Sequence, residues 1–149
     1  MVVDVDICGL KIGDNHPVRL MGVINLSRES FYKGSVVDTD SVLDVAQRMI
    51  DDGATIIDLG ARSTWPLANP ITKQEECDRL LPALELLKDN LDAVISVDTV
   101  FSDIAEKALE KGADVVNDVA GFATDGGMLD VVADHGCPAV VMAAGKLPG

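Results

Sequence analysis

Four apolar segments of this sequence each end in a carboxylate or amide side chain. The segments are GVIN, TIID, ISVD and DVVN, which end at Asn25, Asp58, Asp98 and Asn117. A single polar residue in such a position often forms a turn or caps a helix. Four in succession indicate a ligand site, because carboxylates and amides hydrogen-bond the edge of a flat heterocycle that carries paired N–H groups. The same groups also coordinate hard cations.

The residue patterns that several other kinds of catalytic or binding site require are missing from this sequence. No Ser-His-Asp or Cys-His set can be drawn from these segment ends, which disfavours nucleophilic acyl transfer. The sequence has no Walker A motif and no GxGxxG after a predicted strand. Its two histidines, His16 and His135, lie far apart, which disfavours a histidine metal site. The three cysteines, Cys8, Cys77 and Cys137, show no CxxC spacing, so we expect reduced thiols and a cytoplasmic location.

Composition limits the partners that the chain is expected to bind. The 149 residues suffice for one globular domain, and 12 Lys and Arg against 25 Asp and Glu give a formal charge of −13. This charge argues against nucleic acid and anionic membranes as partners. No apolar run approaches the roughly 20 residues of a membrane span, and no signal peptide pattern is visible. Composition therefore disfavours nucleic acid and membrane as partners.

The apolar segments alternate with amphipathic helix patterns, which predicts βαβ units and a parallel sheet. The predicted strands cover 18–26, 54–59, 93–97, 113–116 and 138–142, and helix patterns cover 40–52, a segment from 72 onward, 104–109 and 128–132. Because parallel strands end at one edge of their sheet, the four polar side chains are expected at that edge.

Three local patterns add detail to this prediction. Thr72 and Glu75 have the spacing of a capping box at the start of a helix. Pro82 lies inside the same helix pattern, so we expect a kink there or a break after a short first helix. Residues 2–12 alternate weakly, with Gly9 at a turn position, and predict a short β-hairpin ahead of the first main strand.

Two architectures accommodate these units. Five parallel strands in about 150 residues suit an open flavodoxin-like sheet. The same units suit the first five strands of a (β/α)8 barrel, a fold of at least about 200 residues. Periodicity alone leaves both open.

Two loops after the first two main strands carry further polar groups. The first loop contains Arg28 and Lys33, and the second contains Arg62, Ser63 and Thr64. In so acidic a chain, cations gathered beside the expected ligand edge indicate a ligand with an anionic group.

The motifs taken together resemble those of dihydropteroate synthase and its pterin-binding relatives. Order and spacing agree from Arg19 onward, and the matching segments are MGVINLSRESF (21–31), IIDLGARSTWP (56–66), ISVDT (95–99) and VVNDVAG (115–121). The family fold is a (β/α)8 barrel, so the resemblance favours the barrel. It also implies that residues 1–149 are the N-terminal portion of a single barrel domain, truncated to about its first five strands.

The resemblance implies roles for individual residues. Asn25 matches the position that binds Mg²⁺ and the pyrophosphate of the pterin substrate, whereas Asp98 and Asn117 match residues that hydrogen-bond the pterin. Thr64 and Pro66 match a loop beside the aminobenzoate pocket. Asp58, Arg62 and Ser63 complete the candidate substrate-binding set. The implied reaction condenses a hydroxymethyl-dihydropterin pyrophosphate with an aminobenzoate-type acceptor. Loss of the pyrophosphate gives a cationic intermediate that the acceptor amine attacks, and Mg²⁺ would stabilise the negative charge of the departing pyrophosphate.

Two motifs depart from the family pattern. The family's T-P-D-S-F becomes residues 27–31 (SRESF), and its G-G-E-S-T-R-P becomes residues 60–66, with Arg62 in place of Glu and Trp65 in place of Arg. Trp65 replaces a guanidinium group that can bind an anion through two hydrogen bonds, and it offers an aromatic ring for stacking instead. These motif variants look like those of archaeal synthase-like proteins, whose pterin substrate would be a methanopterin precursor. Pterin binding therefore transfers from the family more safely than the synthase reaction does.

Two alternative functions remain open. One is a methyltransferase that passes a methyl group from a methylated tetrahydropterin to a corrinoid. The other is a non-catalytic fragment that binds a pterin or merely folds. Because the family's sixth- to eighth-strand motifs have no counterpart, we expect little synthase activity from this chain alone. Exposed sheet edges of a cut barrel also predict a homo-oligomer.

Overall fold

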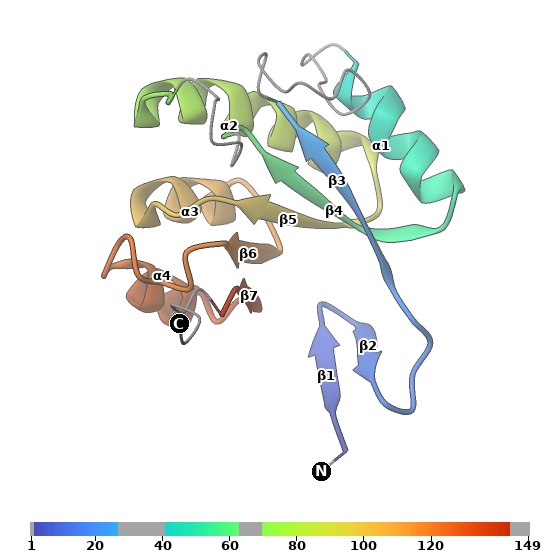
Figure 1. Cartoon of the computed structure of the whole chain (residues 1–149). Helices are drawn as coiled ribbons and strands as arrows, with labels where there is room; N and C mark the ends of the chain where they lie inside the picture. The colour runs from blue at the N-terminus through green and yellow to red at the C-terminus, as the bar shows by residue number, and fades with distance from the viewer. Residues whose placement is uncertain (1, 27–40, 63–69, 144–149) are drawn as a thin grey trace, which may run out of the picture.

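The computed structural model describes residues 2–26, 41–62 and 70–143. Its main feature is a five-stranded parallel sheet in which the strands follow one another in chain order (Figure 1). The strands are β3 (Leu20–Asn25), β4 (Ala54–Gly60), β5 (Val94–Asp98), β6 (Val115–Asp118) and β7 (Ala139–Val141).

In the described part of the chain, four helices lie between the strands in sequence and cover one face of the sheet (Figure 1). The helices are α1 (Val42–Asp51), α2 (Lys73–Asn90), α3 (Ser102–Glu110) and α4 (Met128–His135). None of the helices in the described part of the chain is long and apolar enough to cross a membrane.

The two faces of the sheet differ in burial. Side chains that alternate toward the helices are fully buried in the core, for example Ile57, Ile95 and Val116. On the opposite, inner face, Val23 is 56% exposed and Val140 is 37% exposed. A flavodoxin-like sheet has helices on both faces and a first strand placed inside the sheet. The sequential strand order and single covered face instead identify a partial (β/α)8 barrel, as the family resemblance predicted.

Helix α2 runs unbroken through Pro82, so of the two expected outcomes, a kink or a break, the break does not occur. Pro82 lies on the exposed side of the helix, where the carbonyl that loses its N–H partner is able to face water. At the start of the helix the predicted capping box is present: Thr72 Oγ1 accepts from the Glu75 backbone N–H at 3.1 Å. The Glu75 carboxylate accepts in turn from the Thr72 N–H at 2.7 Å.

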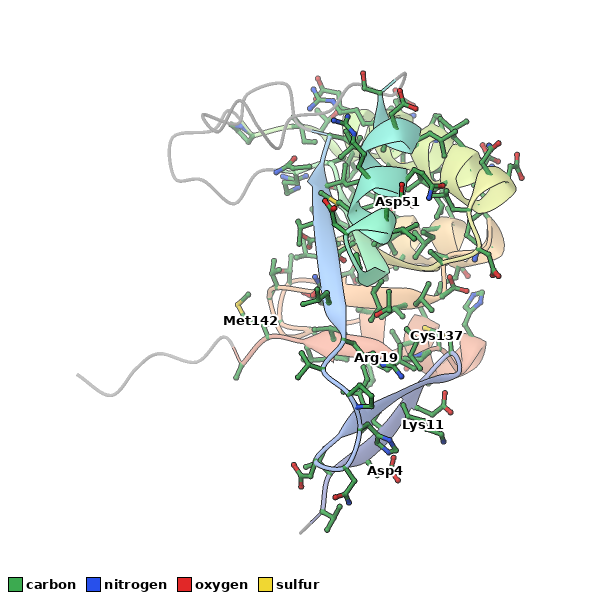
Figure 2. All side chains as sticks on the ribbon, turned by 90° about the vertical axis from the view of Figure 1, so that its right-hand side faces the viewer. Asp4, Lys11, Arg19, Asp51, Cys137 and Met142 are labelled. Carbon is green, nitrogen blue, oxygen red and sulfur yellow. The ribbon has the colours of Figure 1, made fainter. Side chains whose placement is uncertain are left out.

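A separate antiparallel hairpin consists of β1 (Asp4–Ile7) and β2 (Leu10–Gly13). It lies near the N-terminal ends of the sheet strands, where the Cys8 Sγ lies 3.7 Å from the Asp114 carbonyl oxygen. Arg19 follows the hairpin and donates from Nε to the Lys11 carbonyl at 3.3 Å (Figure 2). The hairpin thus occupies the end of the sheet opposite to the predicted ligand edge.

Candidate ligand-binding site

The strand register places three of the predicted site residues in one layer. Paired residues on neighbouring parallel strands point to the same face of a sheet. Across β3 to β7 the pairing runs Asn25, Gly60, Asp98, Asn117 and Val140. We call these five residues the upper layer. It lies on the inner face at the C-terminal ends of the strands, the end that carries active sites in barrel enzymes.

A second layer lies one step deeper and is also polar. The register pairs Val23, Asp58, Ser96 and Val115, which we call the middle layer. Asp58 and Ser96 are buried, and within the described residues Asp58 Oδ1 and Ser96 Oγ have no hydrogen-bond partner. Two buried polar atoms without partners in the barrel interior are typical of a site that a ligand or water completes.

One hydrogen bond connects the two layers. The Asn117 amide nitrogen donates to Asp58 Oδ2 at 3.1 Å. Asp58 therefore contacts the upper layer from below, although its own strand continues for two residues to Gly60.

Asp98 is the one acid among the five residues of the upper layer. Burial, followed by repulsion from Asp58, Glu76 and Asp118, raises the pKa of Asp98 to about 7. Gly60 leaves space for this side chain, since a Cβ at position 60 would lie 3.3 Å from the Asp98 Cβ. Asp98 is thus a carboxyl group that changes its protonation near neutral pH.

Asn25 offers one amide oxygen for a metal ion at the end of β3. Within residues 2–26, 41–62 and 70–143, no group of three or more His, Cys, Asp or Glu side chains is arranged to hold a metal. This donor set fits Mg²⁺ only where a ligand's own phosphate oxygens and water complete the octahedral shell, which is how Mg²⁺ commonly binds.

Arg62 contacts protein groups in the connection between β4 and α2. Its Nε donates to Glu76 Oε2 at 3.0 Å, and an Nη donates to the Ile71 carbonyl at 3.0 Å. Glu76 is fully buried, and its other oxygen accepts from Thr99 Oγ1 at 2.7 Å. The Arg62 guanidinium also lies 5.1 Å from the centre of the Phe101 ring. These contacts give Arg62 a structural role. Substrate binding by Arg62 stays a prediction.

Other predicted positions lie outside the described residues. These are Ser63 and Thr64 of the candidate set, together with Arg28, Lys33, Trp65 and Pro66 of the two loops.

Sequence reasoning missed three polar residues that the structure places near the site. Ser96 is two residues before Asp98 in the same strand, so strand alternation alone would have placed both on the inner face. Glu76 has a weaker signal, an acid within the apolar stripe of Cys77 and Leu80. No pattern in the sequence singled out Thr99 by itself as a site residue.

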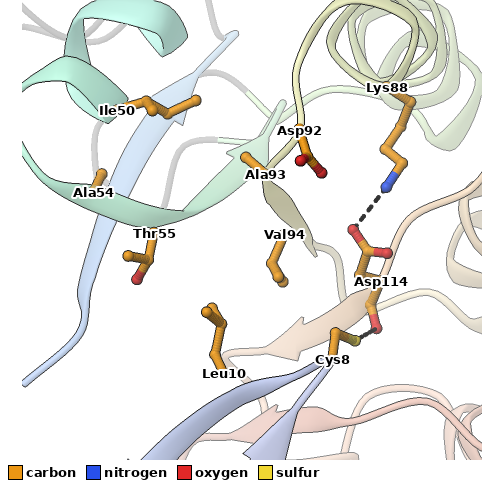
Figure 3. Close-up of a pocket in the computed structure, with 10 residues that line it drawn as sticks. All are labelled: Cys8, Leu10, Ile50, Ala54, Thr55, Lys88, Asp92, Ala93, Val94 and Asp114. Atoms are coloured by element: carbon orange, nitrogen blue, oxygen red, sulfur yellow. Dashed lines mark hydrogen bonds and ion pairs between the residues drawn. The ribbon is translucent and has the colours of Figure 1, made fainter. Parts of the chain in front are cut away.

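A pocket of about 470 Å³ lies at the other end of the sheet, between the hairpin and the N-terminal ends of β4 and β5 (Figure 3). Two of its three charged groups pair with each other: Lys88 Nζ lies 2.9 Å from Asp114 Oδ2, which also accepts from the Ile95 N–H at 2.8 Å. The third charged group is Asp92. The upper layer, with its titrating acid and its buried unpaired neighbours, is therefore the better candidate site.

Comparisons with known proteins show similarity over most of the chain. A family model described as "Pterin binding enzyme" matches residues 21–149. The chain is 40% identical over 124 residues to the dihydropteroate synthase of Bacillus subtilis, covering 83% of this chain and 44% of that protein.

Two solved structures extend this similarity to the fold. Dihydropteroate synthase from Clostridium difficile, solved in the presence of pteroic acid, superposes with a TM-score of 0.79 at 36% identity, over 88% of this chain and 50% of that one. The Xanthomonas albilineans enzyme with 4-aminobenzoic acid gives a TM-score of 0.81 at 30% identity, over 100% and 55%. The chain thus spans about half the length of these relatives.

Proposed function

Because the chain belongs to the pterin-binding enzyme family, we propose that its upper layer binds a pterin ring. The observation that carries this proposal is the shared layer of Asn25, Asp98 and Asn117, which three different strands bring to the C-terminal end of the sheet.

The chemistry of the layer matches the pyrimidine edge of a pterin. That edge carries an amino group and a ring N–H, both donors, beside a carbonyl acceptor. The ionised Asp98 carboxylate accepts from the donors, and the Asn117 amide both donates and accepts. Burial strengthens these bonds, because the surrounding medium is less polar than water.

For the whole protein we propose the dihydropteroate synthase reaction. In this reaction the bond between the pterin methylene carbon and the diphosphate oxygen breaks, and its electron pair leaves with the diphosphate. The amine of an aminobenzoate-type acceptor then bonds to that carbon and loses a proton. Support comes from the relatives, which are named as synthases and were solved with pteroic acid or 4-aminobenzoic acid.

Asn25 is the residue that we assign to the diphosphate end of the substrate. Its amide oxygen would hold a Mg²⁺ ion that arrives with the diphosphate, and that ion neutralises leaving-group charge when bound. Asn25 thereby fixes the direction of the substrate, since Asp98 and Asn117 hold the opposite, pyrimidine end.

Titration calorimetry with 6-hydroxymethylpterin tests the pterin assignment. We expect the unmodified chain to bind it and Asp98→Asn to abolish the binding heat, because the substitution removes the charged acceptor. Asp103→Asn is the matched control: Asp103 lies exposed on α3, where it pairs with Lys73 at 2.9 Å. Unchanged affinity in Asp98→Asn would refute the assignment.

A further inference from the structure

Within the described residues, Asp58 contacts the upper layer through one hydrogen bond, which the Asn117 amide nitrogen donates. Asp58 is only 3% exposed, and its second oxygen has no partner within the described residues. A buried carboxylate with an unpaired oxygen costs free energy compared with an apolar side chain of similar size. Fold stability therefore does not explain a carboxylate at this position.

The bond determines which way the Asn117 amide faces. An ionised carboxylate accepts hydrogen bonds and cannot donate them. If the amide were turned over, the Asn117 carbonyl oxygen would face the Asp58 oxygen without a proton between them. The amide nitrogen must therefore point to Asp58, and the carbonyl oxygen is directed away from it.

We propose that Asp58 is a positioning residue that fixes the Asn117 amide so that its carbonyl oxygen is presented to the ligand as an acceptor. The inference rests on the proposed pterin site and deepens it, because it assigns the donor–acceptor pattern of the site to a residue beneath the ligand. The ligand class that this pattern selects is a heterocycle with an N–H donor at the edge facing Asn117.

Two substitutions at the same position separate the acceptor role of Asp58 from its charge. Asp58→Asn removes the charge but retains an oxygen that accepts from the Asn117 amide. Asp58→Leu removes both and leaves the amide free to turn over. Binding of 6-hydroxymethylpterin is measured by calorimetry at pH 8.5, where the Asp98 carboxyl group is ionised in every variant.

We expect Asp58→Asn to bind within about twofold of the unmodified chain and Asp58→Leu to bind about tenfold more weakly, the effect of one mismatched hydrogen bond. Asp58→Leu should unfold at the same temperature or higher, so weaker binding cannot be assigned to unfolding. Asp103→Asn is the matched control, because it removes an exposed carboxylate on α3 outside both layers, and its affinity should stay within twofold.

Equal affinities in Asp58→Leu and the unmodified chain would overturn the inference while leaving the pterin site intact. If the unmodified chain bound no pterin, the proposed function would fail and this inference with it. A ligand-independent readout is the side-chain amide NMR signal of Asn117. We expect it to move in Asp58→Leu but to move little in Asp103→Asn, and an unmoved signal in Asp58→Leu would also overturn the inference.

Discussion

Asp98 combines two properties that bear on how the site works. Its side chain lies in the layer that we assign to the pterin, and its pKa of about 7 lies within the physiological range. Burial is the main cause of this raised pKa, and the negative charges of Asp58, Glu76 and Asp118 add to it. The protonated form of Asp98 loses an acceptor that the pterin amino edge needs.

We therefore predict that pterin affinity falls as the pH is lowered through about 7. The measurement is the dissociation constant of 6-hydroxymethylpterin from pH 5.5 to 8.5 by calorimetry. Asp58→Asn should move the midpoint to lower pH, because it removes a negative charge that opposes ionisation of Asp98. An affinity that does not change over this range would show that Asp98 ionisation plays no part in binding.

At the residue scale, much of the site follows from the sequence. The polar ends of successive strands brought Asn25, Asp98 and Asn117 together, because parallel strands end at a common edge. The same reasoning placed Asp58 at the edge, whereas β4 continues to Gly60 and leaves Asp58 one layer deeper. A one-step error in where a strand ends moves a side chain between layers, and sequence patterns do not fix strand ends that closely.

At the element scale, the connection between β4 and α2 depends on an ion pair between Arg62, which is 30% exposed, and the fully buried Glu76. Arg62 bonds to Glu76 and to the Ile71 carbonyl, so it joins both sides of the connection. Thr99 joins the same cluster from the end of β5. The sequence showed Arg62 only as a loop cation, because its partner is 14 residues away on a helix whose burial depends on the fold.

We predict that Arg62→Met lowers the free energy of unfolding by about 3 kcal/mol, because it leaves the buried Glu76 carboxylate without its cation. Lys73→Met is the matched control, since Lys73 also lies over the Phe101 ring but pairs with the exposed Asp103. Its loss should stay below about 1 kcal/mol. Urea unfolding measures both, and similar losses in the two variants would contradict the role given to the ion pair of Arg62 and Glu76.

Helix α2 shows where sequence patterns succeed and where they fail. The capping box of Thr72 and Glu75 is a local pattern, and it predicted the helix start correctly. Pro82 removes one backbone hydrogen bond, but the packing of Leu80, Ala83 and Leu84 in the core keeps the helix continuous. Packing against the rest of the fold therefore keeps the helix continuous, and a local sequence pattern carries no information about such packing.

At the scale of the whole molecule, the sheet has two edges. Within the described residues, β3 pairs only with β4 and β7 pairs only with β6. Apolar side chains on or beside these edge strands are partly exposed, among them Val23, Val140 and Met142. Unpaired edges and exposed apolar surface favour association between copies.

We predict that this chain forms dimers or larger species, and that salt increases the associated fraction. The formal charge of −13 makes copies repel one another, and salt screens that repulsion. Size-exclusion chromatography with light scattering at about 0.05 and 0.5 M salt measures this. A single monomeric species under both conditions would contradict the prediction.

The overall architecture required more than periodicity. Alternating strands and helices suited either an open sheet or a barrel, and the family resemblance favoured the barrel. The structure agrees through two features that periodicity does not contain: strands in sequential order and helices on one face.

The most direct test of the central claim is a crystal structure of this chain with 6-hydroxymethylpterin. We predict that the pterin ring lies at the C-terminal ends of the strands, with its pyrimidine edge within hydrogen-bond distance of Asp98 and Asn117. A ring bound elsewhere, for example in the pocket beside Cys8 and Lys88, or a crystal soaked with the compound that shows no ring in the upper layer, would contradict the account.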